Sequence, residues 1–183
     1  MVPALTAEQV IIALMRIAGS LPVLRWPFWG AVAVIFVDLS DLFSMNVLDL
    51  GGVPDYQSFD KWLDLAYMAT FLIVALRWTG LTRRVAIGLF MFRIAGDIIF
   101  EMTQARAVLL AFPNVFEFWF LFVVARDQFK PQYKITLRRA VIWLLVLTAA
   151  KEFQEYALHL GKWFDEYTFL DFWGVLWRTL TPW

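Results

Sequence analysis

The chain has 183 residues, of which 61% are hydrophobic and 18% aromatic, and its mean hydropathy is +0.65. An average soluble domain is about 45–50% apolar, so this composition predicts that much of the surface faces something other than water. Cysteine is absent, which excludes disulfides, thiolate metal sites and a cysteine nucleophile. The formal net charge is zero, so no nucleic acid partner is expected.

The first predicted element is an amphipathic helix over residues 6–18. Thr6 is typical of a helix N-cap, and Glu8 and Gln9 follow it in the first turn. Apolar residues then recur at helical spacing: Val10, Ile11, Leu14, Ile17 and Ala18. We expect this helix to lie in a membrane interface with its apolar side in the lipid.

Five apolar stretches follow, each close to the roughly 20 residues that a helix needs to cross a bilayer. They are residues 27–45, 60–78, 83–103, 107–125 and 138–160. Pro113 should kink the fourth stretch or divide it into a half-helix and a re-entrant segment. The tryptophan-rich segment 162–183 is too short and too aromatic to cross, so we predict that it lies in the interface.

These elements predict an all-α fold, a polytopic membrane helical bundle of about five transmembrane helices with interfacial helices at both ends. No internal repeat is evident, so residues 1–183 are expected to form a single integral membrane domain.

The distribution of Lys and Arg predicts an orientation in the membrane. With the N-terminus inside, ten of these residues lie on the inner side and four on the outer side. The inner set is Arg16, Arg25, Arg77, Arg83, Arg84, Arg126, Lys130, Lys134, Arg138 and Arg139, and the outer set is Lys61, Arg106, Lys162 and Arg178. The excess of inner basic residues predicts a cytoplasmic N-terminus and a C-terminus outside.

Ten ionisable residues remain within the stretches once the loops are set aside: Asp38, Asp41, Asp64, Arg93, Asp97, Glu101, Glu117, Lys151, Glu152 and Glu155. Eight are acids and two are bases, which is a formal excess of six negative charges. Crowded carboxylates in a low dielectric cannot all stay ionised, so we expect some to be protonated or a cation to lie among them.

Helical spacing gives these residues an expected geometry. Asp38 and Asp41 are three residues apart and share one helix face. Arg93, Asp97 and Glu101 lie four residues apart, and an Arg93–Asp97 ion pair is expected within this stripe. A second stripe at the same spacing comprises Lys151, Glu155 and His159. In the expected orientation most of these residues fall in the outer half of the membrane, which predicts an outward-facing acidic cavity over an apolar floor.

The expected function is that of a small multi-pass membrane protein whose acidic cavity binds a cation or protons, for transport or for cation-coupled recognition of a small ligand. The residues expected to bind the ligand or protons are Asp38, Asp41, Asp64, Arg93, Asp97, Glu101, Asn114, Glu117, Lys151, Glu152, Glu155 and His159. Asp38, Asp41 and Asp64 are the candidate ligands of a divalent cation such as Mg²⁺, Ca²⁺ or Mn²⁺.

Two alternatives stay open. One is a divalent-metal-dependent membrane enzyme that acts on a lipid or amphiphile with the same acids, although no catalytic residue is assigned. The other is a structural subunit of a membrane complex, in which the charges only hold helices together. The expected partners are the lipid bilayer, the small ligand or cation, and further copies of the chain or subunits of a complex.

The stretch Asp38-Leu39-Ser40-Asp41, followed by Asp60 and Asp64, resembles the acidic motif of the CDP-alcohol phosphotransferases. The resemblance implies a membrane enzyme whose aspartates, on two neighbouring helices, bind a divalent metal. This sequence departs from the pattern, because no glycine follows Asp41, the Ala-Arg pair is missing, and Met68 stands where a further aspartate is expected. Those enzymes act on the cytoplasmic side, whereas the charge count predicts that these acids lie outside, so no membership is assigned.

Overall fold

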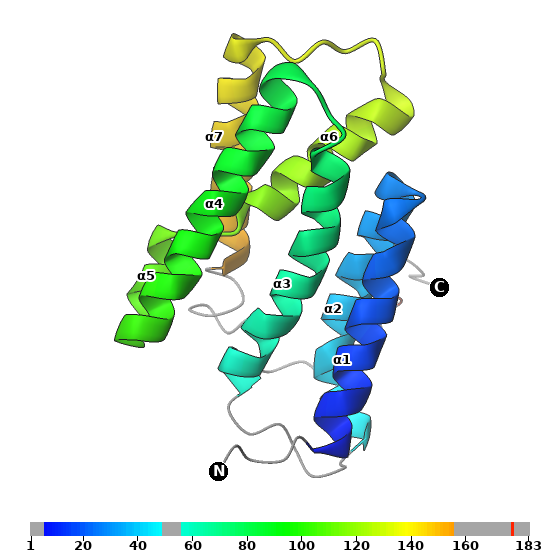
Figure 1. Ribbon diagram of the computed structural model, residues 1–183, viewed down its shortest axis with the longest axis vertical. Coiled ribbons are helices and arrows are strands. Elements are labelled where there is room, and N and C mark those ends of the chain that lie inside the picture. Colours follow the sequence, from blue (N-terminus) through cyan, green and yellow to red (C-terminus); the bar gives the residue numbers. More distant parts are fainter. Residues whose placement is uncertain (1–5, 49–55, 156–176, 178–183) are drawn as a thin grey trace.

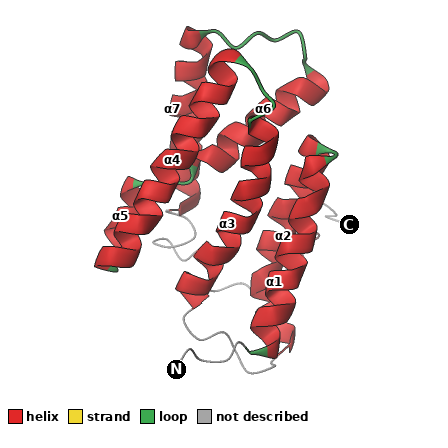
Figure 2. Ribbon diagram, viewed as in Figure 1, coloured by secondary structure: helices red, strands yellow, loops and turns green. Residues whose placement is uncertain are grey.

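A computed structural model describes residues 6–48, 56–155 and Trp177 (Figure 1). Every regular element in this part of the chain is helical, as Figure 2 shows, so the all-α prediction is confirmed. The elements are α1 (Ala7–Ser20), the short 3-10 helix η1 (Leu21–Leu24), α2 (Pro27–Leu48), α3 (Tyr56–Ala75), α4 (Gly80–Thr103), α5 (Arg106–Ala111), α6 (Val115–Phe129) and α7 (Leu137–Glu155). The predicted interfacial segment 162–183 lies outside the described residues apart from Trp177, and His159 lies outside them as well.

The helices form a bundle in which successive long helices run in opposite directions (Figure 1). In that view α1 rises, α2 descends, α3 rises and α4 descends, while α6 rises again and α7 descends. Short connections such as the turn between α3 and α4 require this antiparallel order, because a chain that turns back within a few residues must lie beside the helix it has left. The connections between α1 and α2, between α3 and α4, and between α6 and α7 therefore all lie at one end of the bundle, at the top of this view.

Proline divides the chain between α5 and α6. α5 ends at Ala111 and α6 begins at Val115, with Pro113 between them. Proline has no backbone N–H to donate to a helix and its ring clashes with the preceding turn, so a continuous helix over this stretch is disfavoured. The predicted interruption of the fourth stretch at Pro113 is confirmed, and the re-entrant segment stays a prediction.

The prediction of five transmembrane helices is wrong for the part of the chain that the structure describes. None of its helices combines the length and the hydropathy that crossing a membrane requires. One reason is the ionisable residues inside the helices, such as Arg93, Asp97 and Glu101 in α4, which lower the mean hydropathy of any window that contains them. Another is the break at Pro113, which leaves α6 with 15 residues. The predicted integral membrane localisation, with a cytoplasmic N-terminus and a C-terminus outside, is overturned by the same finding.

Helix α1 is a member of the bundle and packs against α2 and α3. The predicted N-cap is confirmed: Thr6 Oγ1 accepts a hydrogen bond from the backbone N–H of Gln9 at 3.2 Å, and Gln9 Oε1 accepts one from the backbone N–H of Thr6 at 2.9 Å. The buried face of α1 consists of Gln9, Ile12, Arg16 and Ser20. Its exposed residues include Val10, Leu14 and Ile17, three of the residues expected to form an apolar side. The face of α1 that contains the polar side chains of Gln9 and Arg16 thus packs against the neighbouring helices.

Aromatic side chains form the centre of the core between α3 and α6. Phe71, Phe116, Trp119 and Phe120 are all completely buried. The rings of Phe71 and Phe120 are stacked with their centroids 4.0 Å apart, which joins α3 to α6 directly. Buried aromatic pairs of this kind contribute roughly 0.5–1.5 kcal/mol beyond the area that they bury.

Gly96 allows the end of α5 to approach α4. A Cβ atom at this position would lie 2.3 Å from Cβ of Phe112, the residue that follows α5. The atom in the way belongs to the root of a side chain and cannot swing aside. Only a glycine at position 96 is therefore compatible with this contact.

We predict that Gly96→Ala lowers the free energy of unfolding by about 1–3 kcal/mol, because the added methyl group overpacks the contact with Phe112. The matched control is Gly88→Ala on the same helix, where a Cβ meets no atom within 4 Å. The control should be neutral or stabilise the protein by up to about 1 kcal/mol through the better helix propensity of alanine. Denaturant unfolding of the two variants measures the difference, and equal stability would contradict the packing described here.

Candidate functional site

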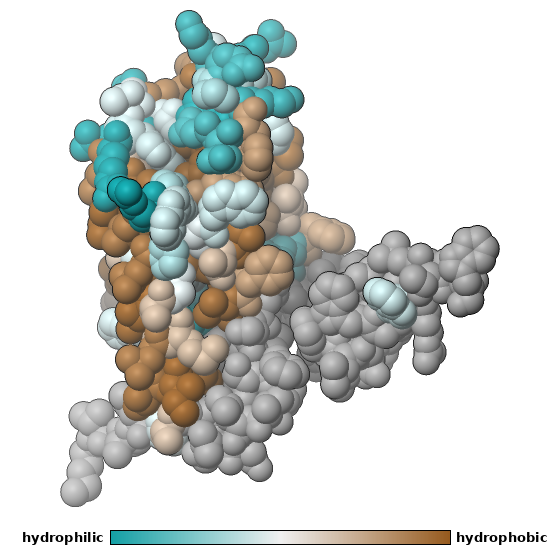
Figure 3. All heavy atoms as spheres, turned by 90° about the vertical axis from the view of Figure 1, so that its right-hand side faces the viewer, coloured by the Kyte–Doolittle hydropathy of each residue, from teal (hydrophilic) through white to brown (hydrophobic). Residues whose placement is uncertain are grey.

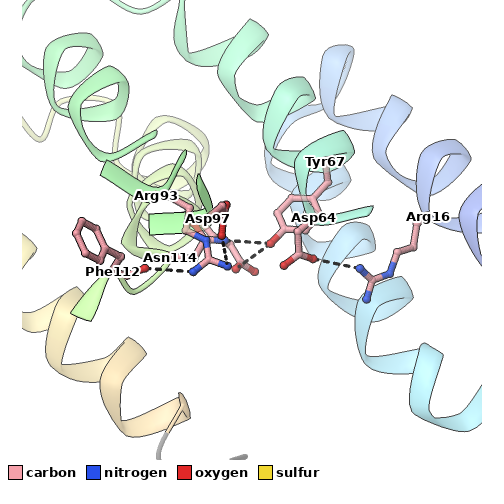
Figure 4. A network of polar contacts seen from close by, with 8 residues as sticks. Arg16, Asp64, Tyr67, Arg93, Asp97, Phe112 and Asn114 are labelled. Atoms are coloured by element: carbon pink, nitrogen blue, oxygen red, sulfur yellow. Dashed lines mark hydrogen bonds and ion pairs between the residues drawn. The ribbon is translucent and has the colours of Figure 1, made fainter. Parts of the chain in front are cut away.

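Ionisable and polar side chains from four helices lie in one layer through the interior of the bundle (Figure 4). We call this layer the polar belt, and it consists of Arg16, Asp64, Tyr67, Arg93, Asp97, Asn114 and Glu117. Five of these residues belong to the site predicted from the sequence. The belt therefore brings together residues that are far apart in the chain.

At one side of the belt α1 is joined to α3 by an ion pair. Arg16 Nη1 donates to Asp64 Oδ1 at 3.1 Å, and the two side chains are only 5% and 21% exposed. Charges that have left water to this extent require a partner of opposite sign. Asp64 was predicted as a metal ligand, whereas here its carboxylate is in contact with a guanidinium.

The hydroxyl group of Tyr67 connects α3 to the start of α6. It accepts a hydrogen bond from Asn114 Nδ2 at 3.1 Å and donates one to Glu117 Oε2 at 3.4 Å. Asn114 is buried and immediately precedes α6, so these contacts fix the beginning of that helix after the break at Pro113. The sequence predicted Asn114 and Glu117 as site residues, and Tyr67 is the side chain that joins them.

On the far side of the belt Arg93 holds α4 against the junction of α5 and α6. Its Nη2 lies 3.1 Å from Asp97 Oδ1, which confirms the predicted ion pair. Its Nη1 donates to the backbone carbonyl oxygen of Phe112 at 3.1 Å. One buried guanidinium thus neutralises a carboxylate one turn along its own helix and also satisfies a carbonyl group at the end of α5.

The other predicted site residues lie elsewhere. Glu101 is exposed near the end of α4, and Glu152 is partly exposed on α7. Lys151 is buried, where its ammonium group donates to Gln154 Oε1 at 3.1 Å and lies 5.6 Å from the ring centroid of Phe118. Asp38, Asp41 and Glu155 are placed in helices, but their side chains lie outside the described part. The stripe of Lys151, Glu155 and His159 therefore stays a prediction.

The described residues contain no group of three or more Asp, Glu, His or Cys side chains placed to hold a metal ion. The proposed ligands Asp38 and Asp41 are not covered by that statement, so the divalent cation stays a prediction. Within the polar belt the three carboxylates contact arginine or tyrosine groups of the protein.

Sequence reasoning missed two members of the belt, Arg16 and Tyr67. Arg16 was counted as an orientation signal at the end of an interfacial helix. It lies four residues after Ile12 and four before Ser20, so it belongs to the face of α1 that packs into the bundle. Tyr67 lies three residues after Asp64 on α3, and this spacing is the only sequence signal that could have associated it with the site.

At one end of the bundle the connecting segments are strongly basic. Residues 20–28, 75–84 and 125–139 meet there and contain nine basic residues: Arg25, Arg77, Arg83, Arg84, Arg126, Lys130, Lys134, Arg138 and Arg139. Asp127 is the one acidic residue of these three segments. We call this part the basic end. Figure 3 shows hydrophilic side chains gathered there, while much of the described surface below it in this view is apolar. Nine of the ten residues expected on the inner side of a membrane thus share one end, and the tenth, Arg16, is in the polar belt.

Comparison with known proteins supplies no identity for this bundle. No family model, curated protein or solved structure matches the chain.

The ion pair in the belt can be tested by a double-mutant cycle. We predict that Arg16→Met lowers the free energy of unfolding by about 3 kcal/mol, because it leaves the carboxylate of Asp64 buried without its guanidinium. Adding Asp64→Leu should recover part of that loss, since an apolar pair needs no compensating charge. Denaturant unfolding of the wild type, the two single variants and the double variant measures the coupling energy. Losses that add without coupling would contradict a direct pair.

The role of Tyr67 can be tested with a conservative change. We predict that Tyr67→Phe lowers the free energy of unfolding by about 1–3 kcal/mol, because removal of one hydroxyl leaves the buried amide of Asn114 without its acceptor. Tyr133→Phe is a matched control: the Tyr133 hydroxyl also accepts one hydrogen bond, from Trp143 Nε1 at 3.2 Å, but at a half-buried position. The control should lose less. Thermal unfolding of the two variants measures the difference, and a larger loss in the control would sink this interpretation.

Proposed function

We propose that this protein associates with the surface of an anionic lipid membrane, with the basic end at the headgroups and exposed apolar side chains of the bundle in the interface. The single observation that carries the proposal is that large exposed apolar side chains on the sides of the bundle occur together with basic residues concentrated at one end. Contact of this form requires no described helix to cross a bilayer.

The exposed apolar residues are numerous and adjacent. On α7, Val141, Ile142, Leu145 and Val146 are all exposed, and their spacing of three and four residues makes them neighbours on one helix surface. On α4, Met91, Ile98 and Met102 are exposed in the same way, as are further residues on α1 and α2 such as Leu14, Trp29 and Phe36. Single exposed apolar side chains are ordinary, but contiguous ones are typical of a surface that binds a partner or a membrane.

The charge of the basic end selects the kind of partner. It contains nine basic residues and one acidic residue, so its formal charge is +8. An anionic lipid surface attracts each nearby Lys or Arg by about 1 kcal/mol, and the attraction is screened within about 10 Å at moderate salt. A lipid surface offers both negative headgroups and an apolar interior, which matches the two properties of the bundle. A second copy of the chain would cover apolar faces but would bring its own positive charge.

The other expected functions gain no support from the described residues. Binding of a cation or protons for transport, a metal-dependent reaction on a lipid, and a structural role in a membrane complex all rest on how the acids are arranged. In the polar belt these acids contact arginine and tyrosine side chains. The exposed surface therefore supports lipid contact better than the interior supports any of the three.

The test is flotation of the full chain with vesicles. We predict that the wild type binds vesicles made of equal parts of phosphatidylcholine and phosphatidylglycerol more tightly than vesicles of phosphatidylcholine alone. Arg83→Gln with Arg84→Gln should weaken binding to the anionic vesicles by about 2 kcal/mol at low salt, because both side chains are exposed at the basic end. Added salt should reduce the difference between the variant and the wild type.

The matched control removes two positive charges from the opposite end, with Lys61→Gln near the start of α3 and Arg106→Gln at the start of α5. It should bind the anionic vesicles like the wild type. Equal losses in the two double variants, or no preference of the wild type for anionic vesicles, would refute the proposal. A stable dimer that does not float with vesicles would instead show that a second copy covers the apolar faces.

A further inference from the structure

A hollow opens at the basic end between the α3–α4 connection and the end of α6. It is lined by Arg77 and Trp78 after α3, by Thr79 and Thr82 at the beginning of α4, and by Arg126 and Asp127 near the end of α6. Its volume is about 270 Å³ and it is open to solvent. Because a water molecule takes about 30 Å³ in the liquid, the space accommodates a small anion together with several waters.

The two arginines of the hollow are both held in place by backbone carbonyl groups. Arg77 Nη1 donates to the carbonyl oxygen of Leu24 at 3.1 Å, and Arg126 Nη1 donates to that of Tyr133 at 3.4 Å. A guanidinium has five N–H donors, so each arginine keeps donors for a further acceptor after making this bond. Anchoring of this kind lowers the entropy that the side chains would lose when a ligand binds.

The remaining polar groups define the chemistry of the acceptor. Thr79 and Thr82 bring two hydroxyl groups, which donate to anionic oxygens as readily as they accept. Asp127 is the one opposing group: its Oδ1 lies 2.8 Å from Arg126 Nε. Partial desolvation raises the pKa of Asp127, and the positive charge of Arg126 opposes this rise. The side chain is 48% exposed, so its carboxylate acts against a bound anion.

We propose that this hollow is a subsite for a terminal phosphate group, bound by the guanidinium groups of Arg77 and Arg126 and the hydroxyl of Thr82. A guanidinium pairs with two oxygens of phosphate or of carboxylate through two parallel hydrogen bonds. A terminal phosphate has three free oxygens and can accept from all of these groups at once. It comes either from a lipid headgroup such as that of phosphatidic acid, a source that rests on the proposed function, or from a free phosphate ion.

The two sources are separated by two measurements on the full chain. Isothermal titration with inorganic phosphate, without vesicles, measures binding of the free ion. Flotation compares vesicles of phosphatidylcholine with phosphatidic acid and vesicles of phosphatidylcholine with phosphatidylglycerol, matched for surface potential. We expect a preference of about tenfold for phosphatidic acid, which corresponds to the additional hydrogen bonds to charged oxygens.

Variants separate the hollow from the general charge of the basic end. Arg77→Gln with Arg126→Gln should abolish the preference for phosphatidic acid, whereas Arg83→Gln with Arg84→Gln, outside the hollow, should weaken binding to both vesicles equally. Thr82→Val keeps the size of the side chain but removes its hydroxyl group, so it should reduce the preference for phosphatidic acid. This variant tests the site if the double arginine variant does not fold. Asp127→Asn should increase the affinity for inorganic phosphate and for phosphatidic acid, since it removes the opposing charge.

The outcomes separate this site from the lipid proposal itself. Binding to both anionic vesicles without a preference, together with no heat from inorganic phosphate, would overturn the phosphate site and leave lipid association intact. Binding of inorganic phosphate that depends on Arg77 and Thr82, without flotation on any vesicle, would confirm the site with the free ion as its source and would refute lipid association. A preference for phosphatidic acid that survives Thr82→Val and Asp127→Asn unchanged would also overturn the site.

Discussion

The interior of this bundle is so apolar that a charge within it must be matched by a group of the protein. Aromatic side chains such as Phe71 and Trp119 fill the space between the helices and offer no hydrogen bonds to an ion. An unpaired buried charge costs several kcal/mol, whereas a paired one is tolerated. The pairs Arg16–Asp64 and Arg93–Asp97 both satisfy this requirement. The first pair joins α1 to α3, so it also sets which turn of α1 faces which turn of α3.

The same apolar composition has a second consequence at the surface. More large apolar side chains are present than the core of a bundle of this size can bury, and the surplus lies on the sides of α1, α4 and α7. The antiparallel order of the helices meanwhile gathers three basic connections at one end. An apolar side next to a positively charged end is the arrangement expected of a protein that meets anionic lipid. The phosphate subsite proposed at that end would add specific binding of a phosphate headgroup to the general electrostatic attraction.

Composition misled the prediction in one respect, which concerns the membrane. The apolar stretches have the length of transmembrane helices when counted residue by residue. The prediction assumed that the ionisable residues within these stretches are paired, protonated or bound to a cation, and so tolerated in a membrane. Residues such as Arg93 and Asp97 nevertheless lower the mean hydropathy of the whole helix. The interfacial position predicted for α1 stays a prediction: Leu14 and Ile17 are exposed, while the opposite face with Arg16 makes the tertiary contacts.

Local physics by itself determined the helices, the N-cap at Thr6, the break at Pro113 and the Arg93–Asp97 pair, because each depends on residues at most four positions apart. Tertiary structure decided the rest of the polar belt. Asp64 is paired with Arg16, which is 48 residues away in the sequence. Tyr67 is hydrogen-bonded to Asn114 and Glu117, which are 47 and 50 residues away. Helical periodicity states which face a side chain occupies but not which helix lies opposite, and that choice comes from packing the aromatic core and the antiparallel turns. For the same reason the hollow between Arg77 and Arg126 has no counterpart in any single stretch of the chain.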